Sequence, residues 1–299
     1  MNIYSRDNDL IIENIPDFDI EDVLECGQCF HFTKLEEKEY EILACGKYLR
    51  VKQENDASQE NIENRVILYD TSPKDYENIW KNYFDIERDY KKVKDKIVSI
   101  DGRLTSAVSA KSGIRILKQE FFETLISFII SQNKQIPHIK QIVHTISERY
   151  GECIELSCGR CVYTFPKVDK LYQVSEDELR ECKVGFRAPY IKDAVEKVYN
   201  GEITEDSLKS MTVQEAREKL MTIKGVGEKV ANCVLLFGLG FSDVFPVDVW
   251  MKRIMEYMYF GEDTKKEIIE KFAMEKFGEY AGFAQQYLFF YGRENGLGK

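Results

Sequence analysis

The hydrophobic pattern of this chain changes its period once, near Ser72-Pro73, and this change restricts the possible folds more than any other feature. Before it, short runs of aromatic and β-branched residues are separated by polar turns, which is typical of strands. These runs cover residues 29–33, 40–44, 48–53 and 65–70. After it, apolar residues such as Phe121, Leu125 and Phe128 recur at three and four positions, which is helical spacing. The pattern predicts an α+β fold, with an antiparallel sheet ahead of helices.

Length and local signals divide the chain into two expected domains. At roughly 150 residues per domain, a chain of 299 residues is expected to hold about two. We place a sheet domain at 1–110 and a mostly helical domain at 111–299, with the boundary in the small-residue stretch 105–113. Thr212 and Glu215 form a capping box that starts one of the predicted helices.

The charge of the chain is acidic but uneven. Its 52 Asp and Glu residues against 42 Lys and Arg give a formal net charge of −10. Eight of these carboxylates lie between Asp7 and Glu25, a segment without Lys or Arg. Nucleic-acid binding depends on where the cations lie on the surface, so the acidic total does not exclude it. The 43% of hydrophobic residues does exclude a disordered polyelectrolyte.

The sequence predicts a cytoplasmic protein with reduced thiols and no membrane segment. No run approaches the ~18 apolar residues of a membrane span. The first twenty or so residues lack the basic segment followed by an apolar segment that is typical of a signal peptide. Eight cysteines without an export signal are expected to be thiols rather than disulfides. Zinc bound by Cys26 and Cys29 together with Cys153, Cys158 and Cys161 is a less favoured alternative. We expect no metal and no cofactor.

A helix, a tight turn and a second helix are predicted over about 212–237, which is a helix-hairpin-helix arrangement. In the turn, Gly225 and Gly227 permit positive φ and leave backbone N–H groups bare beside a helix N-terminus. Together with Lys224 they are candidates for binding a DNA phosphate. The same glycines are also compatible with a simple αα-hairpin.

Two charged residues near this turn form a candidate catalytic pair. Lys229 falls in the first turn of the second helix, where the positive end of the macrodipole disfavours a cation and favours the neutral amine that a nucleophile needs. Asp248 lies nineteen residues further on, in Pro246–Val249, and can cap the next helix. A solvated lysine and a purely capping aspartate are the alternatives at this point.

Two segments together carry a resemblance to a known family. Ile223–Cys233 followed by Phe245–Val249 resembles the helix-hairpin-helix DNA glycosylases, with their Gly/Pro-rich segment and Asp. Three further segments, Cys26–Phe30, Ser131–Asn133 and Ala281–Phe289, resemble in the same order those of 8-oxoguanine DNA glycosylases. The resemblance implies a TATA-binding-protein-like antiparallel sheet domain ahead of a helical glycosylase domain.

The resemblance also implies catalytic roles. Lys229 corresponds to the nucleophile that attacks C1′ of the lesion sugar, and Asp248 to the carboxylate that stabilises positive charge on that sugar. The Schiff base formed by Lys229 would allow the strand to be cut by β-elimination. The implied activity is that of a DNA glycosylase and abasic-site lyase acting on 8-oxoguanine.

A pocket for a flipped base is implied as well. Cys233 and Phe289 correspond to the residues that sandwich the base, and Gln285 to the one that bonds its Watson–Crick edge. Gly27 corresponds to the residue whose carbonyl accepts the N7–H of 8-oxoguanine. Without the resemblance, Cys233 and Phe289 are expected in the core, Gln285 on a helix surface and Gly27 in a bulge.

Four residues are implied on the other side of the gap left by the base. Asn133 corresponds to the residue that enters the vacated stack, and Arg187 to one that contacts the opposite cytosine. His138 stands where the family often has arginine, and Phe186 where it has a tyrosine wedge. On the lesion side, Trp250 stands two residues after Asp248 in place of a frequent histidine. The sequence therefore departs from the pattern in recognition of the opposite cytosine and in one lesion-side contact.

The sequence thus predicts an enzyme that flips out and excises 8-oxoguanine from double-stranded DNA, and that works as a monomer in the cytoplasm, on the nucleoid if the source is bacterial. An alkylated-purine glycosylase of the same fold is one alternative, although such enzymes normally lack the lysine at position 229. A helix-hairpin-helix protein that binds DNA without catalysis is another. Relatives with an iron–sulfur cluster carry four cysteines after the motif, whereas no cysteine follows Cys233 here.

Overall fold

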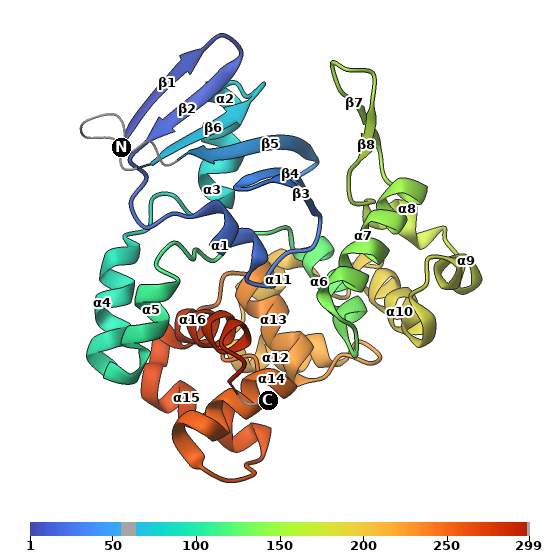
Figure 1. Ribbon diagram of the computed structural model, residues 1–299. Coiled ribbons are helices and arrows are strands. Elements are labelled where there is room, and N and C mark those ends of the chain that lie inside the picture. The colour runs from blue at the N-terminus through green and yellow to red at the C-terminus, as the bar shows by residue number, and fades with distance from the viewer. Residues whose placement is uncertain (55–63, 298–299) are drawn as a thin grey trace.

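The computed structural model describes residues 1–54 and 64–297. Its N-terminal part is a six-stranded antiparallel sheet in the order β1-β2-β6-β5-β4-β3, which lies at the top of Figure 1. The strands are β1 (Asn2–Arg6), β2 (Asp9–Glu13), β3 (Phe32–Glu36), β4 (Glu39–Ala44), β5 (Lys47–Glu54) and β6 (Arg65–Tyr69). A separate hairpin of β7 (Cys153–Glu155) and β8 (Cys161–Tyr163) projects from the helical part.

Helices form most of the rest of the chain and lie below the sheet in Figure 1. The α-helices are α1 (Ile20–Glu25), α2 (Pro73–Asp75), α3 (Lys81–Tyr83), α4 (Tyr90–Ile100), α5 (Thr105–Ala110), α6 (Phe121–Ser131), α7 (Ile136–Tyr150), α8 (Val168–Tyr172), α9 (Glu176–Glu181), α10 (Ala188–Tyr199), α11 (Glu205–Lys209), α12 (Val213–Met221), α13 (Glu228–Gly238), α14 (Val249–Met255), α15 (Lys266–Phe277) and α16 (Ala281–Glu294). Short 3-10 turns span Gly102–Leu104, Gly185–Arg187 and Gly278–Tyr280, and π-helical turns span Tyr76–Trp80 and Glu256–Phe260.

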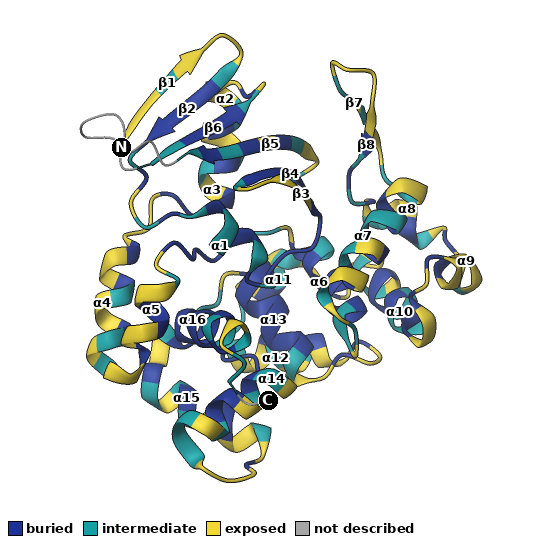
Figure 2. Cartoon of the chain, in the orientation of Figure 1, coloured by how far each residue is buried: buried dark blue, intermediate teal, exposed yellow. Residues whose placement is uncertain are grey.

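Two hydrophobic cores lie side by side. The first is formed by the sheet together with α1 and the aromatic segment 73–86, in which Trp80, Tyr83 and Phe84 pack edge to face. The second surrounds α13, every residue of which is buried from Val230 to Gly238. Buried positions follow the inner faces of the elements in Figure 2. The helices α4 and α5 contribute to this second core.

Two buried polar side chains join the sheet to the helices. The Gln28 amide donates to the carbonyls of Val23 and Arg115 and accepts from the Leu117 N–H. The Arg115 guanidinium, 1% exposed, donates to the carbonyls of Pro16, Asp17 and Asp85. Both networks satisfy buried polar groups with partners from distant segments, so they fix how the two parts meet.

The structure confirms the predicted α+β fold, in which an antiparallel sheet precedes a mostly helical part. Sequence reasoning missed β1, β2 and α1, because the acidic residues around the short apolar run Leu10–Ile12 concealed the strand. It also started β3 too early. Residues 27–30 form a loop instead, since Gly27 takes φ +85° and the Gln28 side chain is bound away from the sheet.

Within the described residues, no helix has both the length and the apolar character needed to cross a membrane.

Candidate active site

The turn between α12 and α13 contains two glycines with different environments. Gly225 has φ +76°, and a Cβ there would lie 2.3 Å from the Tyr190 ring, so both its conformation and its neighbour require glycine. Gly227 has φ −103°, and nothing lies within 4 Å of a Cβ built on it. Because packing gives no reason for a glycine at 227, the open backbone at the start of α13 is suited to the approach of a ligand. Lys224 beside it is exposed.

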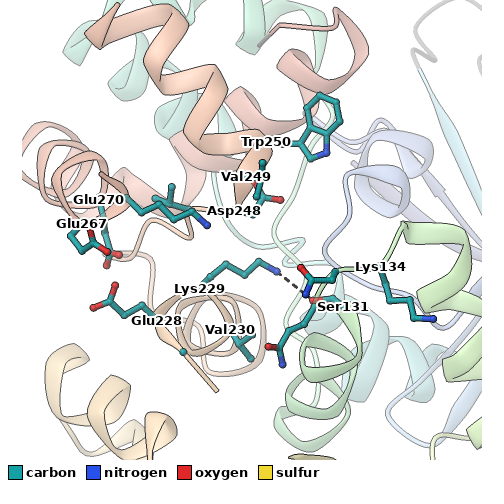
Figure 3. Close-up of a pocket in the computed structure, with 15 residues that line it drawn as sticks. Ser131, Lys134, Glu228, Lys229, Val230, Asp248, Val249, Trp250, Glu267 and Glu270 are labelled. Atoms are coloured by element: carbon teal, nitrogen blue, oxygen red, sulfur yellow. Dashed lines mark hydrogen bonds between the residues drawn. The ribbon is translucent and has the colours of Figure 1, made fainter. Parts of the chain in front are cut away.

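Lys229 lies in the first turn of α13 and is half-buried. Its Nζ donates to Ser131 Oγ at 3.4 Å, and the Ser131 hydroxyl donates in turn to the Phe128 carbonyl at 2.8 Å. The same Nζ lies 5.1 Å from the centre of the Phe128 ring. Figure 3 shows this side chain running from α13 toward the end of α6. The end of α6 therefore sets the direction of the amine.

Asp248 is the N-cap of α14. Its Oδ1 accepts from the Met251 N–H at 2.7 Å, and its backbone has the extended conformation of a capping residue. The predicted capping geometry is therefore present, and it holds the carboxylate in one direction.

Lys229 and Asp248 both line a pocket of about 520 Å³. Its walls come from the loop after α6 and from the starts of α13, α14 and α15. Figure 3 shows Glu228, Glu267 and Glu270 on one side of Lys229 and Ser131 on the other. The lining residues are Ser131, Gln132, Asn133, Lys134, Gly227, Glu228, Lys229, Val230, Val247, Asp248, Val249, Trp250, Lys266, Glu267 and Glu270.

Cys233 lies one turn after Lys229 on α13 and is 3% exposed. Burial raises the pKa of its thiol to about 11; Lys229 opposes this shift and the Asp248 charge adds to it. Both charges thus act on the same buried sulfur. The structure brings Cys233, Lys229 and Asp248 together, as the resemblance implies, and Cys233 is also a core residue.

Gly27 and Phe289 face one another across the junction of the two cores. A Cβ on Gly27 would lie 3.4 Å from Phe289 Cε1 and 3.7 Å from an Arg293 guanidinium nitrogen. Arg293 donates to the Glu25 carbonyl at 2.5 Å, which holds the end of α16 against the loop that carries Gly27. Because Gly27 also takes φ +85°, any larger residue would be strained there, and its Cβ would come into van der Waals contact with Phe289.

Gln285 points into the interior rather than lying on a helix surface. Its side chain is 5% exposed, and its Nε2 lies 3.8 Å from Met251 Sδ. Among the described residues, its Oε1 has no hydrogen-bond partner. A buried amide oxygen without a partner carries a desolvation cost, and a bound polar group would remove that cost. Met251 also donates its N–H to Asp248, so the two side chains share a neighbour.

Three of the residues expected at the DNA gap are exposed. Asn133 lines the pocket and takes φ +52°, a left-handed conformation that asparagine tolerates well. His138 lies exposed in the first turns of α7. Phe186 is 54% exposed and meets the Tyr190 ring edge to face. All three side chains are accessible to a ligand the size of DNA.

Arg187 differs from these three because it is only 2% exposed. Its guanidinium donates to the Val184 carbonyl at 3.0 Å and to the Gln132 carbonyl, and it lies 4.3 Å from the Phe186 ring. Its buried Nε has no partner in the described part of the chain. Contact between Arg187 and an opposite base stays a prediction. In this structure the residue fastens the turn before α10 to the loop that carries Asn133.

A buried polar network beside the pocket was not foreseen. The Arg217 Nε donates to Asn232 Oδ1 at 2.8 Å, and Asn232 Nδ2 donates to Glu270 Oε1 at 3.0 Å. Arg217 also pairs with Glu270 at 2.9 Å. The network ties α12, α13 and α15 together. Its member on α13, Asn232, lies three residues after Lys229. Its members are far apart in sequence and belong to ordinary amphipathic helices, so no local pattern identifies them.

Ser131 and Arg293 were also missed as contacts of the site. The sequence does mark the segment Ser131–Asn133, but only Asn133 receives a role from the resemblance. Arg293 follows Phe289 by four residues, a spacing that puts the two side chains on one face of α16. From that spacing, the position of Arg293 beside Phe289 could have been predicted.

The cysteines do not form the zinc site that was weighed as an alternative. Cys26 and Cys29 are buried, whereas Cys153, Cys158 and Cys161 are exposed on the β7–β8 hairpin. Across residues 1–54 and 64–297, no three His, Cys, Asp or Glu side chains are grouped so that they could hold a metal ion.

Comparison with protein families covers almost the whole chain. Residues 126–279 match the model of the HhH-GPD superfamily of base excision DNA repair proteins. Residues 10–125 match the N-terminal domain of 8-oxoguanine DNA glycosylase. The chain therefore belongs to the HhH-GPD superfamily of base excision DNA repair proteins. Within that superfamily, the N-terminal match confirms the resemblance to 8-oxoguanine DNA glycosylases.

Individual relatives agree with this classification. The chain is 40% identical to Clostridium acetobutylicum 8-oxoguanine glycosylase/lyase, solved with double-stranded DNA containing cytosine opposite 8-oxoguanine; the TM-score is 0.91, and 99% of each chain is covered. A structure described as MBOgg1 with a low-affinity DNA ligand gives 41% identity and a TM-score of 0.92, again over 99% of each chain. A probable N-glycosylase/DNA lyase of Methanothermobacter thermautotrophicus is 30% identical over 269 residues, 83% of this chain and 80% of that protein.

Proposed function

We propose that this chain is a bifunctional DNA repair enzyme that excises 8-oxoguanine from duplex DNA and then nicks the abasic strand. The observation that carries the proposal is the pairing of an amine and a fixed carboxylate in one pocket. Lys229 and Asp248 both line it, and both charges act on the buried Cys233 thiol. Relatives of known structure that share the fold over nearly their whole length support the same activity.

Asp248 would act on the sugar while the base leaves. Cleavage of an N-glycosidic bond builds positive charge on the sugar, and a nearby carboxylate stabilises that charge. The capping bond to the Met251 N–H fixes the direction of Asp248 before the reaction starts. No reorganisation of this group is then required as the charge develops.

Lys229 would form the covalent intermediate. Its amine attacks C1′, and the base departs with the electron pair of the broken N-glycosidic bond and takes up a proton. Cleavage of the C1′–O4′ bond then opens the sugar ring, which gives an imine between Nζ and C1′ and leaves O4′ as a hydroxyl. The imine makes the C2′ proton acidic, so the 3′ phosphate leaves by β-elimination and the strand is cut. Ser131 holds Nζ through its hydroxyl, which already donates to the Phe128 carbonyl and therefore accepts from the lysine.

The lesion would be read by groups at the junction of the two cores. Gln285 presents a buried oxygen without a partner among the described residues, which suits a donor on the Watson–Crick edge of a flipped purine. A Cβ built on Gly27 would lie 3.4 Å from Phe289 Cε1, so the loop at Gly27 and the aromatic ring are close neighbours, as a shared lesion pocket requires. Gly227, with Lys224 beside it, would receive a phosphate of the damaged strand at the start of α13.

We further propose that the enzyme works as a monomer in the cytoplasm. Both proposed catalytic residues, Lys229 and Asp248, line one pocket of this chain, which supports activity of a single subunit.

The alternative substrate is an alkylated purine, and one experiment separates the two. Single-turnover excision is measured on duplexes that carry 8-oxoguanine, 3-methyladenine or an abasic site. We expect rapid release of 8-oxoguanine, nicking at the abasic site and little release of 3-methyladenine. Faster release of 3-methyladenine than of 8-oxoguanine would overturn the proposed substrate. Binding to all three duplexes without any cleavage would favour a non-catalytic DNA-binding protein.

A further inference from the structure

The accessible thiols of this protein lie together on one hairpin. Of the eight cysteines, four are buried and one is partly buried. The three exposed ones are Cys153, Cys158 and Cys161, in or between β7 and β8. Figure 2 shows this hairpin projecting from the helical part with most of its surface exposed. These three thiols are therefore the most accessible to thiol-reactive compounds in solution.

Two of the three thiols share one face of the hairpin. In the antiparallel register, Cys153 pairs with Tyr163 and Glu155 pairs with Cys161. Cys153 and Cys161 are thus diagonal neighbours, a position from which side chains on one face of a sheet can touch. The pKa of the Cys153 thiol is raised, first of all by a side-chain hydrogen bond with Cys161, which agrees with this placement. Cys158 lies in the turn, where it interacts with Arg160 instead.

The hairpin is held at its turn end and by one buried side chain. Arg160, which directly precedes β8, forms a two-pronged ion pair with Glu41 of β4, and Tyr48 donates to the same carboxylate at 2.7 Å. Val162 of β8 is buried and lines a cavity together with residues of α7. The Cys153 and Cys161 thiols are therefore neighbours because of the fold and not only because of local chain flexibility.

We propose that Cys153 and Cys161 form a redox-active dithiol, which a low-molecular-weight disulfide such as oxidised glutathione converts into an intrachain disulfide. The site is separate from the catalytic pocket, with which it shares no lining residue, and the proposal does not depend on the proposed function.

The disulfide forms in two steps of thiol–disulfide exchange with oxidised glutathione. The thiolate of one cysteine attacks the S–S bond of oxidised glutathione, forms a mixed disulfide and releases one glutathione thiolate, which takes up the proton lost by the cysteine. The second cysteine then attacks the protein sulfur of the mixed disulfide, forms the Cys153–Cys161 bond and releases the second glutathione. The two protein thiols are oxidised, and one molecule of oxidised glutathione is reduced to two thiols. Diagonal neighbours lie about 7–8 Å apart, and a disulfide usually spans a Cα–Cα distance of about 4.4–6.8 Å. Closing the bond therefore requires rotation of both side chains and a small approach of the two strands.

Peptide mapping without reduction tests this assignment. The full-length protein is incubated with oxidised glutathione, free thiols are alkylated, and disulfide-linked and glutathione-bearing peptides are identified by mass spectrometry. Wild type is expected to give a disulfide joining Cys153 to Cys161, with no lasting glutathione on either. Cys153→Ser should retain glutathione on Cys161, and Cys161→Ser should retain it on Cys153, because the second step is then blocked.

Cys158→Ser is the matched control, since it removes an exposed thiol of the same hairpin and leaves the proposed pair intact. It should form the Cys153–Cys161 bond at a rate within about twofold of wild type, because thiol–disulfide exchange depends on the reacting thiols and their access. Lasting glutathione on both Cys153 and Cys161 of wild type would overturn the proposal. So would a disulfide from either of them to Cys158.

Discussion

The two sides of the candidate site differ in how their residues are held. On the lesion side, Gln285 and Cys233 are buried, and Gly27 faces Phe289 across the junction of the two cores. On the gap side, His138 is exposed in the first turn of α7, and Phe186 is exposed in the 3-10 turn before α10. The lesion side is therefore part of the hydrophobic core, whereas the gap side, apart from the buried Arg187, is an exposed rim.

This difference matches two of the three positions at which the sequence departs from the family pattern. A change at Gly27 or Gln285 would alter packing as well as the proposed recognition of the lesion. A change at the exposed His138 would alter mainly what the rim offers to DNA. His138 and Phe186 are at the rim, whereas the third departure, Trp250, lines the pocket. We therefore expect changes on the lesion side to affect catalysis strongly, and changes at the rim to affect selectivity.

The largest expected effect is at the amine. Lys229→Gln should abolish both borohydride trapping and strand nicking while the protein still binds duplex DNA, because Lys229 is the proposed covalent partner. Gel-based trapping on an abasic duplex measures this directly. Lys266→Gln removes another amine of the same pocket and serves as the control, with trapping expected at the wild-type level. Trapping by Lys229→Gln at the wild-type level would refute the assignment.

The next effect concerns the carboxylate. Asp248→Asn should slow base release by about 100- to 1000-fold, the scale on which an electrostatic group aimed at developing charge contributes. Its thermal stability should fall little, since asparagine also caps helices well. Single-turnover excision and a melting curve of the same variant separate the two roles. An unchanged rate would reduce Asp248 to a helix cap.

Gln285 tests whether a buried polar group is kept for recognition at a cost in stability. Gln285→Leu should slow excision of 8-oxoguanine by about 10- to 100-fold, since a good base-edge contact discriminates by about 1–3 kcal/mol. The melting temperature should stay the same or rise, because the substitution removes a buried oxygen that has no partner among the described residues. A lower melting temperature together with an unchanged rate would make Gln285 a structural residue.

The smallest effect is expected at the rim. An arginine reads cytosine with a fixed fork of donors, which an imidazole cannot reproduce. Wild type should therefore excise 8-oxoguanine opposite adenine at an appreciable rate, and His138→Arg should raise the preference for cytosine by about tenfold. Gln141→Arg places the same charge on an exposed position of α7 and should change the preference little. Equal and strict selectivity in wild type and His138→Arg would contradict this expectation.

The sequence predicted those parts of the molecule that are determined by local patterns of residues. The change of period predicted the sheet and the helices, and the turn glycines with Asp248 predicted a hairpin and a cap. It did not predict hydrogen bonds and ion pairs between residues that are distant in sequence. The network of Arg217, Asn232 and Glu270 joins three helices, and no helix shows it alone.

Local sequence patterns also gave a wrong expectation of how deeply some side chains are buried. Gln285 was expected on a helix surface in the absence of the resemblance, yet α16 is surrounded by other elements and most of its residues are buried. Contact of Arg187 with the opposite base, which the resemblance implies, stays a prediction; in this structure its guanidinium donates to the Gln132 and Val184 carbonyls, and no local pattern indicated these bonds. A glutamine in an amphipathic pattern does not reveal that other elements cover its helix.

The proposed mechanism depends most on Lys229 as the covalent nucleophile, and mapping the trapped adduct tests this directly. Wild-type protein is incubated with a duplex carrying 8-oxoguanine opposite cytosine in the presence of borohydride, digested, and searched by mass spectrometry for the peptide that carries the reduced sugar. We predict that the sugar is attached to Nζ of Lys229. Attachment to the N-terminal amine, or to Lys134 or Lys266 in the same pocket, would contradict the account.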